Sequence, residues 1–234
     1  RVMMEYLLPY DNYTNKELLG IFGFNYKFAM LITLFLQAYR YAAEPFFFAN
    51  AENENAKEVY AKSMHYFIIA GCFIFLSVMV MIPFIQHMLL SFDPKYAEYF
   101  HGQNVIPILL AANLLLGIYF NLSTWYKVTD KTHIGAMISI FGASMTFILN
   151  WIMIPRYGYT GAATSTLLCY LLMVIVGYIT ELKYYPIPYY IKHGAFYMVL
   201  TLALWQIFDF LKGFLHHQIW IITALSVVML TIYL

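Results

Sequence analysis

Charged residues are scarce in this chain. Only 11% of its 234 residues are Asp, Glu, Lys or Arg, whereas about a quarter of an average soluble domain is charged. Thirty residues without these four types separate Lys62 from Asp93, and 28 separate Glu98 from Lys127. About 20 apolar residues are enough to cross the hydrocarbon core of a bilayer. The scarcity of charge therefore excludes an ordinary soluble domain and predicts an all-α, polytopic membrane helix bundle.

Cysteine and the common catalytic motifs are also rare or missing. The two cysteines, Cys72 and Cys169, lie in separate apolar runs, so we interpret them as membrane-buried residues rather than as a disulfide or a metal site. The sequence contains no CxxC, HExxH, GxGxxG or GxxxxGK[ST] pattern, and its net charge is only +1. We therefore expect no catalytic residues, no metal, no cofactor and no nucleic-acid partner.

Seven apolar stretches are long enough to be membrane spans. They cover residues 18–39, 64–89, 104–125, 134–154, 159–179, 194–210 and 219–234. They are continuous rather than alternating, which excludes the strands of a β-barrel. Residues 155–158 (PRYG) leave so short a connection that the fourth and fifth spans are predicted to form a tight helical hairpin, because Pro ends one helix and Gly permits the turn.

The orientation follows from the positive charges in the loops. One set of alternate loops contains Arg40, Lys57, Lys62, Lys127, Lys131, Lys183 and Lys192, and the other contains Lys16, Lys95, Arg156 and Lys212. Cytoplasmic loops are enriched in Lys and Arg. Seven cations against four place the loops at residues 40–63, 127–133 and 181–193 on the cytoplasmic side.

Polar residues follow one face of the first span. Tyr26, Thr33, Gln37, Arg40 and Glu44 are separated by 7, 4, 3 and 4 residues, which is helical spacing, and Lys27 lies about 100° from them around the axis. A charged group at membrane depth faces a cavity or a partner by default. We therefore predict a water-filled pathway for an anionic head group, with these six residues and Asn25 as candidate lining residues. The last turn is insecure, because a proline follows Glu44 directly.

Two simpler interpretations stand beside this one. Arg40 could extend to the interface and pair locally with Glu44, four residues further along the helix. The aromatic residues, 20% of the chain, cluster at span ends, as at Tyr96, Tyr99 and Phe100. An interfacial belt explains such clusters, and stacking of some tyrosines on a sugar-bearing substrate is the second interpretation.

The segment Gly20–Phe48 (GIFGFNYKFAMLITLFLQAYRYAAEPFFF) resembles a patterned segment of bacterial polysaccharide-export flippases. The matching elements are Gly20–Gly23, Tyr26–Ala29, Gln37–Arg40 and Glu44–Phe46, although Phe22 and Phe24 depart from the usual pattern. Residues 99–132 and 150–168 are also similar to family segments. These O-antigen flippase-like proteins belong to the multidrug/oligosaccharidyl-lipid/polysaccharide exporter superfamily, which is MATE-like and has about fourteen helices in two lobes.

The resemblance implies that the chain is a piece of a longer transporter. Residues 1–17 would hold the end of a preceding span and an outer loop, residues 18–180 the helices of the carboxy-terminal lobe, and residues 181–234 two trailing helices. The amino-terminal lobe of the same protein would then complete the cavity.

The implied function is transport rather than catalysis. An undecaprenyl-diphosphate-linked oligosaccharide would move from the inner to the outer leaflet of the bacterial inner membrane by alternating access, coupled to H⁺ or Na⁺. The first alternative is a multidrug or toxic-compound exporter of the same superfamily, which would be expected to carry acidic residues at membrane depth. The second is a membrane glycosyltransferase or glycan polymerase, but such enzymes usually need a large outer loop with catalytic acids.

Overall fold

The structure is a computed structural model that describes residues 2–8, 12–214 and 219–233. Residues 1, 9–11, 215–218 and 234 belong to the predicted segments 1–17 and 181–234 but lie outside the described residues. The described part is helical and contains no strand, which confirms the expected all-α membrane bundle. The helices are α1 (Val2–Leu7), α2 (Asn12–Ala49), α3 (Ala56–Phe92), α4 (Tyr96–Phe100), α5 (Val105–Leu122), α6 (Thr124–Val128), α7 (Thr132–Tyr184), α8 (Ile191–Phe214) and α9 (Ile219–Tyr233).

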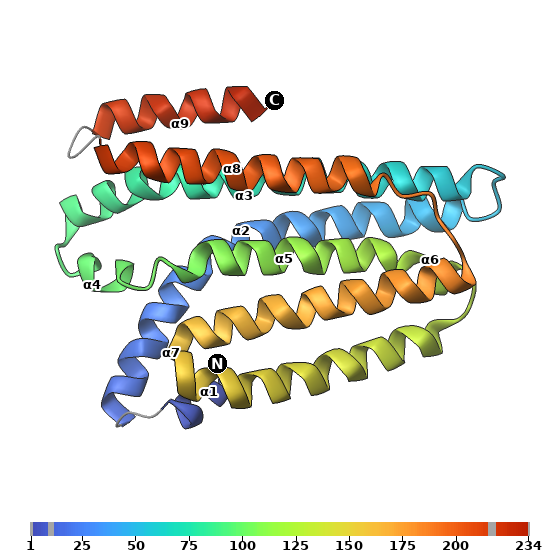
Figure 1. Cartoon of the computed structure of the whole chain (residues 1–234), viewed down its shortest axis with the longest axis horizontal. Coiled ribbons are helices and arrows are strands. Elements are labelled where there is room, and N and C mark those ends of the chain that lie inside the picture. The colour runs from blue at the N-terminus through green and yellow to red at the C-terminus, as the bar shows by residue number, and fades with distance from the viewer. Residues whose placement is uncertain (1, 9–11, 215–218, 234) are drawn as a thin grey trace.

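Long, roughly parallel helices make up the bundle (Figure 1). Within the described ranges, five helices are long and apolar enough to cross a membrane, and α9 is a shorter apolar helix. One of the five, α7, is two helices joined at Gly158, whose backbone is not helical (φ 58°, ψ −138°). Its two halves run back along each other (Figure 1), so the tight hairpin predicted from residues 155–158 is present. The described residues of the seven predicted spans lie on helices, except Asn104 and Ser123, which flank α5.

Several hydroxyl side chains inside the apolar runs are satisfied locally. The hydroxyls of Ser77, Thr164 and Thr201 each donate to the carbonyl oxygen four residues earlier, at 2.8 Å. Because lipid offers no hydrogen-bond partners, such bonds within the helix let Ser and Thr enter a membrane span.

Helix α5 lies at the centre of the bundle, between α2, α3 and α7. In its most apolar stretch 72% of the residues are buried, whereas the corresponding value for α2 is 22%. Close packing of α5 depends on Gly117, where an added Cβ would lie 2.1 Å from the ring of Phe67. Asn113 on α5 donates to the carbonyl oxygen of Ala29 on α2, at 3.2 Å. Interhelical bonds of this kind hold membrane helices together.

One face of α2 is left uncovered. Its exposed residues follow helical spacing, at Gly20, Lys27, Leu31, Leu34, Ala38, Tyr41 and Pro45. The helix also bends, so that its amino-terminal part diverges from the bundle (Figure 1). Of the residues predicted to line a pathway, this uncovered face carries Lys27.

The last two helices are attached at one side. Among the described helices, α8 and α9 approach only α3 and each other closely. Ser226 and Tyr233 of α9 donate hydrogen bonds to the carbonyl oxygens of Val80 and Ile69 of α3, both at 2.9 Å. Helices α8 and α9 thus form a separate layer beside α3 (Figure 1).

Candidate substrate-contact sites along helix α2

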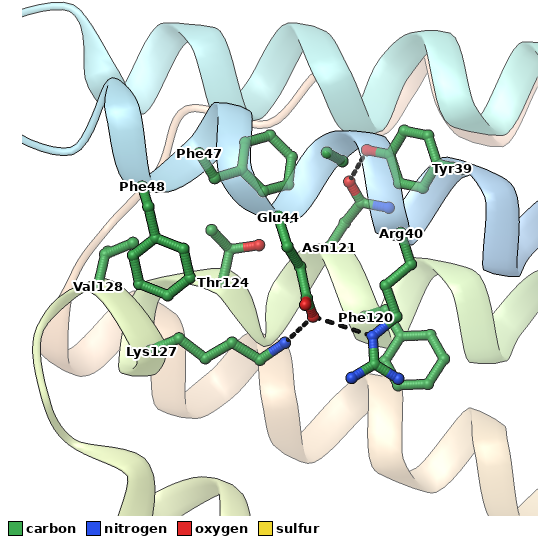
Figure 2. A pocket seen from close by; sticks show the side chains of 11 residues that line it. Tyr39, Arg40, Glu44, Phe47, Phe48, Phe120, Asn121, Thr124, Lys127 and Val128 are labelled. Atoms are coloured by element: carbon green, nitrogen blue, oxygen red, sulfur yellow. Dashed lines mark hydrogen bonds and ion pairs between the residues drawn. The ribbon is translucent and has the colours of Figure 1, made fainter.

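A cluster of two cations and one carboxylate lies near the carboxyl end of α2. Oε1 of Glu44 accepts a bond from Nε of Arg40 at 2.9 Å and from Nζ of Lys127 at 2.6 Å (Figure 2). Arg40 and Glu44 lie on α2, whereas Lys127 comes from α6. The cluster keeps one net positive charge, because a single carboxylate faces two permanent cations.

Aromatic and amide groups hold this cluster in place. The Arg40 guanidinium lies 4.9 Å from the centre of the Phe120 ring, which is a cation–π distance. Nearby, the Tyr39 hydroxyl donates to Oδ1 of Asn121 at 2.5 Å and lies 2.9 Å from the Ser63 hydroxyl. The cavity enclosed by these side chains is only about 20 Å³, roughly the space for one water molecule.

Arg40 retains hydrogen-bonding capacity in this arrangement. Among the described residues, its hydrogen bonds to protein run from Nε to Glu44, and 48% of the side chain is exposed. The two terminal nitrogens of the guanidinium can therefore bind a phosphate or carboxylate bidentately. The local Arg40–Glu44 pairing suggested as an alternative is present, and it leaves this binding edge open.

The predicted residues do not all gather at this cluster. Lys27 and Arg40 are 13 residues apart on α2, which corresponds to about 20 Å along the axis. Gln37 is exposed beside Arg40, and Thr33 is partly buried. The partly buried Tyr26 packs its ring on Phe22, with 6.0 Å between centroids. Lys27 is exposed in a second, larger pocket at the other end of the helix.

Asn25 does not reach the exposed face. It is fully buried, and its Nδ2 donates to the carbonyl oxygens of Ile21, at 2.8 Å, and Tyr99, at 2.7 Å. The candidate lining role is therefore replaced by a packing role that ties α4 to α2. The expectation that the helix weakens at Glu44 is also wrong, because Pro45 lies inside α2 and the helix continues to Ala49.

Lys127 was not among the candidate lining residues. Its partner Glu44 is 83 residues away in sequence, so no local spacing connects them. One sequence feature could have suggested Lys127: it lies in a loop that is predicted to be on the same side of the membrane as Arg40. Phe120 and Asn121 carry no signal beyond their apolar run.

Within the described ranges, a bundle with five helices long and apolar enough to cross a membrane is typical of a multi-pass membrane protein. The MatE family profile matches residues 12–152, which is more than half of the chain. The chain therefore belongs to the MatE family, in the exporter superfamily that the sequence analysis named.

A solved structure extends this likeness over nearly the whole chain. "Lipid II flippase MurJ, inward closed conformation" matches with a TM-score of 0.58 and 14% identity, over 89% of this chain and 46% of that one. At this identity the likeness shows the fold alone, and the chain spans less than half of that protein. No curated protein sequence matches the chain. The family match and the shared fold therefore agree on a multi-pass membrane protein of the MatE superfamily of transporters.

Proposed function

We propose that the chain belongs to a flippase for undecaprenyl-diphosphate-linked oligosaccharide, the repeat unit of O-antigen, capsule or exopolysaccharide. The flippase moves this substrate from the inner to the outer leaflet of the bacterial inner membrane by alternating access. An amino-terminal lobe of the same protein supplies the other wall of the cavity, and H⁺ or Na⁺ supplies the driving force. The bilayer and the lipid-linked oligosaccharide are the partners.

One observation carries this proposal: the exposed charged side chains of α2 between Gly20 and Tyr41 are both cationic. They are Lys27 and Arg40, which lie on different sides of the helix. Lys127 adds a further positive charge beside Arg40, because it binds the same oxygen of Glu44. A diphosphate needs cationic partners, and Arg and Lys are the side chains that supply them.

The alternative, a cation-coupled multidrug exporter, has less support. Such an exporter needs a carboxylate that is available to an organic cation or a proton. Glu44 is already bonded to two cations, and Asp209 on α8 is bonded to Lys212 at 2.7 Å. Glu181 is buried and accepts the backbone N–H of Ile187. None of these three carboxylates lies free on the open face of α2. A glycosyltransferase or polymerase is the weakest candidate, because the family is one of transporters.

Genetic complementation tests the proposal. The complete transporter is expressed in a strain that lacks its own flippase, and surface glycan display is measured at matched membrane levels. We expect the wild type to restore display, and Lys27→Ala and Arg40→Ala each to reduce it by about tenfold, the effect of losing one charge-assisted contact. Lys212→Ala is the control, because Lys212 forms an exposed pair on α8, away from α2.

Three results would count against parts of the proposal. If both α2 variants match the wild type, these two residues do not contact the substrate. If the wild type fails to restore display but confers resistance to cationic drugs, the exporter takes the flippase's place. If Lys212→Ala fails as severely as the α2 variants, the loss reflects general damage rather than a substrate contact.

A further inference from the structure

A second pocket lies between the amino-terminal part of α2, the end of α3 and α4. Its volume is about 630 Å³, within the range of small-molecule sites, and it is open on one side. It lies on the side of the membrane that the loop charges predict to be outside, at the opposite end of α2 from Arg40. The pocket therefore forms a site separate from the cluster at Glu44.

Aromatic rings form one wall of this outer pocket. The Phe24 ring lies 5.2 Å from the ring of Tyr99 and 6.1 Å from that of Tyr96, and the two tyrosine rings are 6.2 Å apart. Tyr99 is 38% exposed, so part of its ring is available to a ligand. Sugar rings present apolar C–H faces, and an aromatic wall with hydroxyl groups at its edge offers both packing and hydrogen bonds.

Buried contacts fix this wall before any ligand binds. Nδ2 of the fully buried Asn25 donates to the carbonyl oxygen of Tyr99 at 2.7 Å, which holds α4 against α2. The following turn packs as closely: a Cβ added at Gly102 would lie 2.5 Å from the Ile21 side chain and 2.9 Å from Nδ2 of Asn25. A wall held in this way loses little conformational entropy on binding.

Two ammonium groups face the pocket with one carboxylate. Lys27 comes from α2, and Lys95 and Asp93 come from the turn before α4. Oδ1 of Asp93 accepts the backbone N–H of Lys95 at 2.9 Å, so this oxygen is used within its own turn. Over the described ranges neither lysine forms an ion pair. With Asp93 counted, the two lysines leave the pocket one net positive charge.

Two glycines provide the space. Gly20 and Gly23 lie on the pocket side of α2, and a Cβ added to either would meet no atom within 4 Å. Glycine weakens a helix by roughly 1 kcal/mol relative to alanine, so helix stability does not explain these two residues. Their effect is to leave the helix backbone bare beside the aromatic wall.

We propose that the outer pocket binds an anionic saccharide, with the aromatic wall packing on the sugar ring and Lys27 and Lys95 binding its phosphate or carboxylate group. The inference rests on the proposed function for the source of the saccharide, which is the glycan part of the flipped substrate. Arg40 lies about 20 Å further along α2. The outer pocket would therefore hold the glycan on the release side, separately from the cluster at Glu44.

Binding of N-acetylglucosamine 1-phosphate to the purified complete transporter tests the inference, by titration calorimetry in neutral detergent. We expect Lys27→Gln and Lys95→Gln to weaken binding by about tenfold each, and Gly23→Leu to weaken it by narrowing the pocket beside Phe24 and Lys27. Lys16→Gln and Gly213→Leu are the matched controls. Lys16 is exposed on α2 but does not line the pocket, and a Cβ at Gly213 also meets nothing within 4 Å.

The remaining probes separate the possible sources of binding. Neutral N-acetylglucosamine should bind more weakly than the phosphate, and inorganic phosphate and phosphatidylglycerol should compete poorly. If either of these two anions binds as tightly as the sugar phosphate, the pocket is an anion site and the inference is wrong. If a transporter that restores glycan display binds none of the probes, only this inference fails. If glycan display is not restored but Lys27→Gln and Lys95→Gln weaken sugar-phosphate binding as expected, only the proposed function fails.

Discussion

At the scale of single residues, Glu44 has two partners that compete for one oxygen. Its Oε1 binds Arg40 from its own helix and Lys127 from α6. Without this carboxylate the two cations would lie close together and repel each other. We interpret Glu44 as a limit on the positive charge, which lets the site attract a diphosphate without holding it permanently.

Glu44→Gln tests this role. The change keeps the shape but removes the negative charge, so we expect tighter retention of the substrate and reduced glycan display. The free energy of unfolding should fall by less than about 1 kcal/mol, because partly exposed ion pairs contribute little. Glycan display and thermal unfolding in detergent are the measurements.

Glu58→Gln is the control for that variant. Glu58 pairs with one cation, Lys62, at 2.8 Å and is exposed, so the same chemical change removes a pair without joining two cations. We expect normal display from it. Equal display from both variants would contradict the charge-limiting role of Glu44.

The site was only partly predictable from the sequence, for reasons visible in these residues. The Arg40–Glu44 pair follows from their separation of four on a helix. Lys127 could not be assigned, because its contact depends on how α6 packs on α2. Asn25 was placed wrongly with the lining candidates, because spacing on one helix does not say which face a neighbour such as α4 covers.

At the scale of elements, Gly158 determines the hairpin in α7. Its φ of 58° and ψ of −138° lie in a backbone region where any residue with a Cβ atom is strained. We predict that Gly158→Ala lowers the free energy of unfolding by about 1–3 kcal/mol. Thermal unfolding in detergent measures this.

Gly20→Ala serves as the comparison for the hairpin variant. It changes a glycine in regular helix, where an added Cβ meets no atom within 4 Å. We expect no loss of stability from it, since alanine favours helix. If Gly158→Ala were as stable as Gly20→Ala, the turn would not depend on glycine.

Helix positions were predicted more accurately than helix lengths. The apolar pattern indicated residues 18–39 and 64–89, but α2 covers Asn12–Ala49 and α3 covers Ala56–Phe92. Hydropathy detects only the part of a helix that lies in lipid. Backbone hydrogen bonding continues into polar residues beyond the membrane, and no apolar signal marks where it stops.

At the scale of the whole molecule, the two ends of the bundle should be accessible from opposite sides of the membrane. Cys72 and Cys169 are 0% and 1% exposed, so they should give little background with a thiol reagent. Glu54, between α2 and α3, and Glu98, on α4, are both exposed. The chain thus allows two reporters, each with one added exposed cysteine and the same change of charge.

We predict that Glu98→Cys reacts with a membrane-impermeant maleimide in intact cells, whereas Glu54→Cys reacts only after permeabilisation. This follows from the excess of Lys and Arg in the loops predicted to be cytoplasmic. Labelling is read by the mobility shift of the complete transporter. The reverse pattern would invert the assignment of inner and outer sites along α2.

The single-sided attachment of α8 and α9 has a consequence for how such a protein can change in evolution. Because this pair approaches only α3 closely within the described structure, its loss or replacement would mainly expose one face of α3 and leave the contacts of α5 with α2 and α7 in place. Two antiparallel helices also return the chain to the side from which it came. A pair of this kind can be gained, lost or exchanged in one genetic event without inverting or unfolding the rest of the lobe.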